Sequence, residues 1–124
     1  MIPNKDDKTA EHCRELFDVL MPALRYVARS CGYALGNHGS LRRDIDLIAA
    51  PWREGAVDAE CLMNKLEKVC MAVIGDYAKQ DKSGFVQKPY GRVGRNIYLT
   101  PFYGDGPYLD ISIMPIQEPK EEEK

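Results

Sequence analysis

Apolar residues recur at steps of three and four over the first quarter of the chain, starting near Thr9. This period predicts one amphipathic helix that ends at Gly32, with an apolar stripe made of Cys13, Leu16, Phe17, Leu20, Leu24, Val27, Ala28 and Cys31. Pro22 lies inside the stripe, where proline removes a backbone hydrogen bond and crowds the preceding turn. A kinked helix and a helix that restarts near Asp18 both satisfy this constraint, and we favour the kink.

A second helix is predicted to begin at the N-cap residue Asp58, and its apolar face comprises Leu62, Leu66, Val69, Cys70, Val73, Ile74 and Tyr77. The residues from Lys79 to Gly84 are interpreted as its exit loop. A short mixed run from Tyr33 to His38, which ends at the Gly39-Ser40 turn, and the residues from Asp44 to Ala50 are interpreted as two strands. Three more strands are predicted between glycine-rich turns, over Phe85 to Tyr90, Asn96 to Phe102 and Tyr108 to Met114. The predicted fold class is α+β, a mixed β-sheet of about five strands with two main helices packed on one face.

Chain length and net charge limit the number of domains and the kinds of partner. The chain has 124 residues, 44% of them hydrophobic, which suits one domain with a core. We assign this domain to residues 1–116 and expect the charged residues 117–124 to be disordered. A net charge of −2 argues against a general nucleic-acid coat, so a nucleic-acid acceptor would be bound only locally.

The cysteines and the distribution of apolar residues indicate the cellular compartment in which the protein is expected. The four cysteines form no CxxC pair or zinc-ligand pattern, and three of them fall on the apolar helical stripes, where they are expected to be buried. The polar N-terminus and the lack of a long apolar run predict neither a signal peptide nor a membrane span. We therefore expect a cytoplasmic protein without membrane contact.

Acidic residues alternate with apolar ones directly after a glycine turn, in the sequence Gly39-Ser40-Leu41-Arg42-Arg43-Asp44-Ile45-Asp46. The two-residue period of a strand places Asp44 and Asp46 on one face. Asp110 and Ser112 have the same relation to the apolar residues of the last predicted strand. If the two strands are neighbours, three carboxylates converge, and a divalent cation with oxygen ligands is their natural partner. Like-charge repulsion then predicts a raised pKa for at least one carboxylate.

The Gly39-Ser40 turn, the Asp44-Ile45-Asp46 strand and the later Asp110 resemble, in type and order, the nucleotidyltransferase superfamily related to the DNA polymerase β palm. The resemblance extends from His38 to Asp110. The stretch from Gly39 to Trp52 also looks like that of small phage- and prophage-encoded proteins. The resemblance implies a minimal nucleotidyltransferase-like fold, a nucleoside triphosphate as donor, and Mg²⁺ or Mn²⁺ as the cofactor.

The resemblance also implies a role for each motif residue. Asp44 and Asp46 would hold metal ions on the triphosphate, and Asp110 would bind a second metal and help to activate the attacking hydroxyl. Gly39 and Ser40 would contact phosphates through backbone amides and a hydroxyl. These roles suit phosphoryl transfer, which depends on charge neutralisation and positioning more than on covalent chemistry.

The spacing of the motif departs from the family. In familiar members the segment between the Gly-Ser pair and the first Asp is long enough for a short helix whose N-terminus faces the phosphates. Here only Leu41, Arg42 and Arg43 intervene, so this helix cannot form. Two interpretations remain: Arg42 and Arg43 bind the nucleotide phosphates with their side chains, or nucleotide binding has been lost.

Several other side chains suit either a functional or a structural role. His38 adjoins the turn and could contact a phosphate or cap the strand end, and we favour the structural role. A local basic group that could steer a nucleotide, or form a solvated hairpin tip, consists of Lys88, Arg92 and Arg95. Trp52 and Tyr98 could stack on a base, although aromatic residues near strand ends are more often packed.

Three functions fit these residues. The first is transfer of a nucleotide from a triphosphate to an unknown hydroxyl or phosphate acceptor. The second is a catalytically inert binding or regulatory module of the same fold, and the third is a metal-dependent phosphohydrolase. Because the chain has no obvious second domain to hold an acceptor, an active form would use surface from a second copy or a protein partner.

Overall fold

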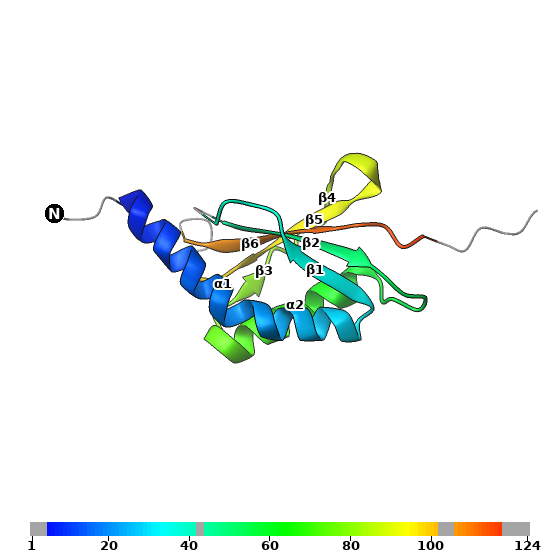
Figure 1. Ribbon diagram of the computed structural model, residues 1–124, viewed down its shortest axis with the longest axis horizontal. Helices are drawn as coiled ribbons and strands as arrows, with labels where there is room; N and C mark the ends of the chain where they lie inside the picture. Colours follow the sequence, from blue (N-terminus) through cyan, green and yellow to red (C-terminus); the bar gives the residue numbers. More distant parts are fainter. Residues whose placement is uncertain (1–4, 42–43, 102–105, 118–124) are drawn as a thin grey trace, which may run out of the picture.

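Two helices cover one face of a mixed β-sheet in the computed structural model of the chain (Figure 1). The structure describes residues 5–41, 44–101 and 106–117, and six strands fall within these ranges. The predicted α+β class, with both helices on one side of the sheet, is confirmed. Arg42, Arg43 and residues 118–124 of the predicted tail lie outside the described residues. Within the described ranges, neither helix combines the length and the apolar character that a membrane crossing needs.

Helix α1 (Lys5–Ser30) carries the predicted apolar stripe and begins before Thr9. It runs through Pro22 without a break, so it does not restart at Asp18. Figure 1 shows the helix changing direction near its middle, in the region where proline perturbs the helical hydrogen bonds. Gly32 follows the helix at a φ of 93°, a backbone conformation that glycine adopts without strain, and terminates it as predicted.

Helix α2 (Ala59–Ile74) begins at the predicted N-cap, because the Asp58 carboxylate accepts a hydrogen bond of 2.8 Å from the amide of Cys61. Its buried side consists of Leu62, Met63, Leu66 and Cys70. The predicted apolar face was too long: Val73, in the last turn, is 40% exposed and Tyr77 is 46% exposed. Tyr77 is exposed beyond the end of the helix, so the 3.6-residue period no longer applies to it.

The strands of the sheet are β1 (Tyr33–Asn37), β2 (Ile45–Pro51), β3 (Lys79–Gln80), β4 (Val86–Gln87), β5 (Val93–Tyr98) and β6 (Tyr108–Ile113). Their order is β1-β2-β6-β5-β3, and β4 pairs with β5 beside this path. Strands β2 and β6 are parallel, whereas the other pairs are antiparallel. A parallel pair needs a long crossover, and α2 lies within it. The two strands with acidic residues are therefore neighbours, although they are far apart in the sequence.

The segment between α2 and β6 differs from the prediction. The expected exit loop Lys79 to Gly84 contains β3, which pairs with the end of β5. The expected strand Phe85 to Tyr90 is reduced to β4 and followed by a 3₁₀ turn, Pro89–Gly91. Strand β5 begins earlier than the predicted strand Asn96 to Phe102, and Gly94 lies inside it opposite Ser112. Glycine in a strand often marks a close approach by another group, which is the case here.

The core lies between the helices and the sheet. Alternate residues of β2 and β6 are buried there, namely Ile45, Leu47, Ala49, Leu109, Ile111 and Ile113. Burying one leucine or isoleucine side chain contributes about 1.5–3 kcal/mol. Cys13, Cys31 and Cys70 are buried as predicted, and burial raises the pKa of Cys70 to about 12. Because the apolar residues face the helices, the intervening residues of β2 and β6 face the uncovered side of the sheet.

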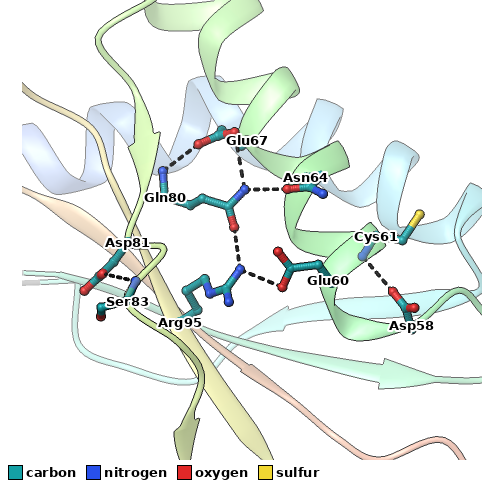
Figure 2. Close-up of polar contacts among 9 residues, drawn as sticks. All are labelled: Asp58, Glu60, Cys61, Asn64, Glu67, Gln80, Asp81, Ser83 and Arg95. Carbon is teal, nitrogen blue, oxygen red and sulfur yellow. Dashed lines mark hydrogen bonds and ion pairs between the residues drawn. The ribbon is translucent and has the colours of Figure 1, made fainter.

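A buried arginine ties the sheet to α2 on the helix-covered face (Figure 2). The Nη1 atom of Arg95, in β5, lies 2.9 Å from Oε1 of Gln80 and 2.9 Å from Oε2 of Glu60. Nε2 of Gln80 in turn donates a hydrogen bond of 2.7 Å to Asn64. The guanidinium also stacks over the ring of Phe85, 3.9 Å from its centroid. This network holds β3, β5 and α2 in a fixed relation.

Candidate metal centre

Three carboxylates converge on the uncovered face of the sheet. Asp46 and Asp110 are direct partners in the parallel register of β2 and β6. Asp44 immediately precedes β2, rather than lying inside it as predicted, and still joins them. One carboxylate oxygen from each residue lies within 4.8 Å of the others, and all three residues are half-buried. The predicted convergence of the three acids is confirmed.

The Gly-Ser turn packs directly against this cluster. The backbone amide of His38 donates a hydrogen bond of 2.8 Å to the carbonyl of Asp46. A Cβ atom on Gly39 would lie 2.5 Å from Oδ2 of Asp46, so only glycine permits this approach without moving the carboxylate. The Asn37 side chain brackets the turn, accepting a 3.3 Å hydrogen bond from the Gly39 amide. Gly39 and Ser40 are exposed beside the acids, where a ligand could reach them.

The turn ends in an unusual backbone conformation. Leu41 has a φ of 57°, in the left-handed region that non-glycine residues seldom adopt. Its side chain is half-buried against the hydrophobic core. Core packing of this side chain therefore offsets the backbone cost of turning the chain back into β2 within a short connection. The two arginines of this connection are not among the described residues, and their predicted contact with phosphates stays a prediction.

The electrostatics of the cluster follow from burial and like charge. Burial raises the pKa of Asp46, and Asp44 and Asp110 raise it further, whereas His38 acts in the opposite direction. The predicted rise of one carboxylate pKa is therefore confirmed, although repulsion is not its largest cause. The phenol of Tyr108 lies near the same acids; its pKa is raised by burial and then by the charges of Asp44, Asp110 and Asp46.

Lys88 reaches the cluster from the β4–β5 hairpin. Its Nζ atom lies 3.2 Å from Oδ1 of Asp110 and 2.8 Å from Oγ of Ser112. The predicted basic group of the hairpin does not form, because Arg95 is buried on the opposite face. Arg92 is half-buried and donates to the carbonyl of Pro89. Of the three residues only Arg95 lies inside a strand, and the alternation of β5 turns its side chain to the helix-covered face.

A pocket of about 230 Å³ opens beside Asp110. It is lined by Asp81, Ser83, Gly84, Val86, Lys88, Gly94, Arg95, Asn96 and Asp110. Asn96 is the partner of Asp110 in the register of β5 and β6. Asn96 and Tyr108 were not predicted as site residues, although the two-residue period of β6 places Tyr108 on the face of Asp110. Only the strand pairing could place Asn96 there.

Trp52 and Tyr98, the two aromatic residues considered for base stacking, each contact a neighbouring side chain. Trp52 follows the C-terminal end of β2, at the other end of the strand from Asp46, and Arg53 stacks over its ring at 5.8 Å. Tyr98 packs edge-to-face against Tyr108, with ring centroids 6.1 Å apart. The half-buried Tyr98 is packed, as expected for an aromatic residue near a strand end. Trp52 is 54% exposed, so the packing expected for it is not observed.

The donor set fits a hard divalent cation. Mg²⁺ and Mn²⁺ prefer oxygen ligands and are typically bound by one or two protein carboxylates together with water and phosphate oxygens. Asp44, Asp46 and Asp110 offer carboxylate oxygens within 4.8 Å of one another. Their partial exposure leaves access for further oxygen ligands. The residues present are therefore compatible with a divalent metal site.

Comparison with known proteins yields a distant structural similarity. No protein-family model matches the chain, and no curated protein matches it. Among solved structures, the chain is similar to one described as that of a cytoplasmic RNA terminal U-transferase, with a TM-score of 0.43 and 13% sequence identity. The match covers 86% of this chain and 36% of the other, so the chain spans about a third of the length of that structure. None of these comparisons bears on the resemblance to phage proteins.

Proposed function

We propose that the protein is a metal-dependent nucleotidyltransferase that uses a nucleoside triphosphate as donor. The observation that carries the proposal is the meeting of Asp44, Asp46 and Asp110 around one point, directly beside the Gly39-Ser40 turn. The sequence motif resembles the nucleotidyltransferase superfamily in residue type and order, and the fold brings its separate parts together. Gly39 also lies directly against the carboxylate of Asp46, a close approach that an unrelated group of three surface acids would not need.

The residues have distinct proposed roles. Asp44 and Asp46 hold the cation, and Asp110, next to the 230 Å³ pocket, faces the acceptor. Bound Mg²⁺ or Mn²⁺ supplies charge neutralisation for the triphosphate. The exposed Gly39-Ser40 turn, together with Arg42 and Arg43, is proposed to bind the phosphates. In this arrangement the protein acts by positioning and electrostatics, as phosphoryl transfer requires.

The size of the pocket beside Asp110 indicates how much of a nucleotide the chain could enclose. A volume of about 230 Å³ is smaller than the roughly 300–1,000 Å³ typical of sites that enclose a drug-sized ligand. A nucleotide would therefore lie largely on an open surface. We propose that a second copy or a partner protein completes the acceptor side of the site.

Isothermal calorimetry of the full chain with MgCl₂ and each of the four ribonucleoside triphosphates tests the binding step. We expect heat with at least one triphosphate and a loss of affinity of about 100-fold or more in D46N, because metal coordination contributes several kcal/mol. D76N, which removes an exposed acid remote from the cluster in sequence, is the matched control and should bind like the wild type. Binding without Mg²⁺, or undiminished binding by D46N, would contradict the proposal.

Triphosphates labelled at the α-phosphate, incubated with the protein and a cell lysate, test the chemical step. A labelled acceptor that disappears in D46N supports transfer. Release of pyrophosphate or phosphate without a labelled acceptor would instead identify a phosphohydrolase. Metal-dependent binding with no turnover of any kind would identify an inert binding module.

A further inference from the structure

A lysine occupies one side of the carboxylate cluster. The ammonium of Lys88 lies between Oδ1 of Asp110 and Oγ of Ser112, at 3.2 Å and 2.8 Å. Its side chain is 25% exposed, so the pair is partly shielded from water. A partly buried ammonium with two oxygen partners is better localised than an ordinary surface ion pair.

The stem of Lys88 lies close against a glycine of β5. The backbone amide of Lys88 donates a hydrogen bond of 2.9 Å to the carbonyl of Arg92 across the hairpin. From there its stem crosses Gly94, where a Cβ atom would lie 2.5 Å from Cε of the lysine. Gly94 is the register partner of Ser112, so the stem that crosses the glycine delivers the ammonium to the serine and to Asp110 beyond it. The close approach of the lysine stem thus explains why a glycine suits this position near the start of β5.

We propose that Lys88 is a built-in counter-cation of the metal centre, which limits the nucleotide-free protein to one divalent cation, held by Asp44 and Asp46. This inference depends on the metal site of the proposed function. Three ionised carboxylates and one ammonium leave two negative charges, which a single divalent cation balances. A second cation at Asp110 would share that carboxylate with the ammonium, and the two positive charges would repel each other. Lys88 must therefore leave Asp110 before a second metal binds.

Titration of the full-length protein with Mn²⁺, followed by electron paramagnetic resonance of the free ion, measures the number of bound ions without any need for activity. We expect one tight Mn²⁺ per wild-type chain. In K88M, which keeps the stem and removes the charge, a second Mn²⁺ should bind about ten-fold or more tightly than any second ion on the wild type. The double variant K88M/D110N should lose this gain, because the ligand released by the lysine is missing.

Two further variants separate the ammonium's position from overall charge and folding. G94A places a Cβ atom where the stem of Lys88 crosses, so it should displace the ammonium and reproduce the K88M titration. K82M removes a lysine that is exposed in the β3–β4 loop and changes net charge equally, so it should titrate like the wild type. Circular dichroism melting checks that each variant is folded. A second site in K82M as strong as in K88M would overturn the proposal, since charge alone would then suffice.

The same titration distinguishes failure of this inference from failure of the proposed function. If the wild type binds one Mn²⁺, D46N abolishes this binding, and K88M titrates like the wild type, only the role of Lys88 is wrong. Two equally tight ions on the wild type would also overturn it. If neither the wild type nor K88M binds Mn²⁺, the metal site itself is absent and both proposals fail.

Discussion

The β4–β5 hairpin places two cations on opposite faces of the sheet, Arg95 toward the helices and Lys88 toward the acids. The Arg95 side chain is 5% exposed and makes an ion pair, an amide hydrogen bond and a ring contact. Lys88 is more exposed and bonds to Asp110, a candidate metal ligand. A planar guanidinium with several fixed partners suits a permanent structural link, whereas a single ammonium on a flexible stem can be exchanged for another cation. The two ion pairs differ in their surroundings, because only the one at Asp110 involves a carboxylate that is also a candidate metal ligand.

The largest expected contrast is in stability. We expect R95M to lower the free energy of unfolding by about 2–4 kcal/mol, since it leaves Oε1 of the buried Gln80 without its donor and breaks the link to Glu60. We expect K88M, measured with a chelator present, to lower it by about 1 kcal/mol or less, because a partly exposed ion pair contributes little. Urea unfolding at neutral pH measures both changes. Equal losses would mean that the two cations do not differ in structural role.

The next effect concerns the approach of the Gly-Ser turn to Asp46. We expect G39A to weaken Mn²⁺ binding by about ten-fold, because the added Cβ would displace Oδ2 of Asp46 and misplaced ligands typically cost this much. G36A is a matched control, since a Cβ on Gly36, in β1, would meet no atom within 4 Å of its position. Its Mn²⁺ affinity should equal that of the wild type. An equal loss in both variants would assign the effect to general destabilisation of β1.

The smallest effect is the pH dependence of Asp46. Its folded pKa is raised above the ordinary value of 3.8, so its contribution to stability is greatest below that value and decreases as pH rises through the folded pKa. Metal-free D46N should therefore be more stable than the wild type at pH 7, by about 1 kcal/mol or less. The advantage should shrink as pH falls toward 3. Melting curves with EDTA from pH 3 to 8 measure it, and a difference that does not change with pH would contradict this origin.

Mn²⁺ should reverse the order of the two proteins at pH 7. A cation bound to the folded state stabilises it by mass action, so Mn²⁺ should raise the Tm of the wild type and leave that of D46N almost unchanged. The same melting curves recorded with and without Mn²⁺ provide this comparison.

Much of the local structure could be predicted from the sequence. The stripe of α1, the N-cap at Asp58 and the alternation around Asp46 and Asp110 are local patterns, because burial on one face repeats with the period of the element. The end of α2 was predicted less well, since Tyr77 has the apolar character of the stripe but lies beyond the helix. Apolar character alone does not show where a helix stops.

By itself, the sequence determined that acidic and glycine residues occupy strand and turn positions of the right type and order. Only the tertiary structure decided that Asp110 pairs with Asp46, that Gly94 lies under a lysine stem, and that Lys88 bonds to an acid 22 residues away. The physical reason is that side-chain periodicity is a property of each segment. Strand order and register instead arise from contacts between segments, which no local pattern records.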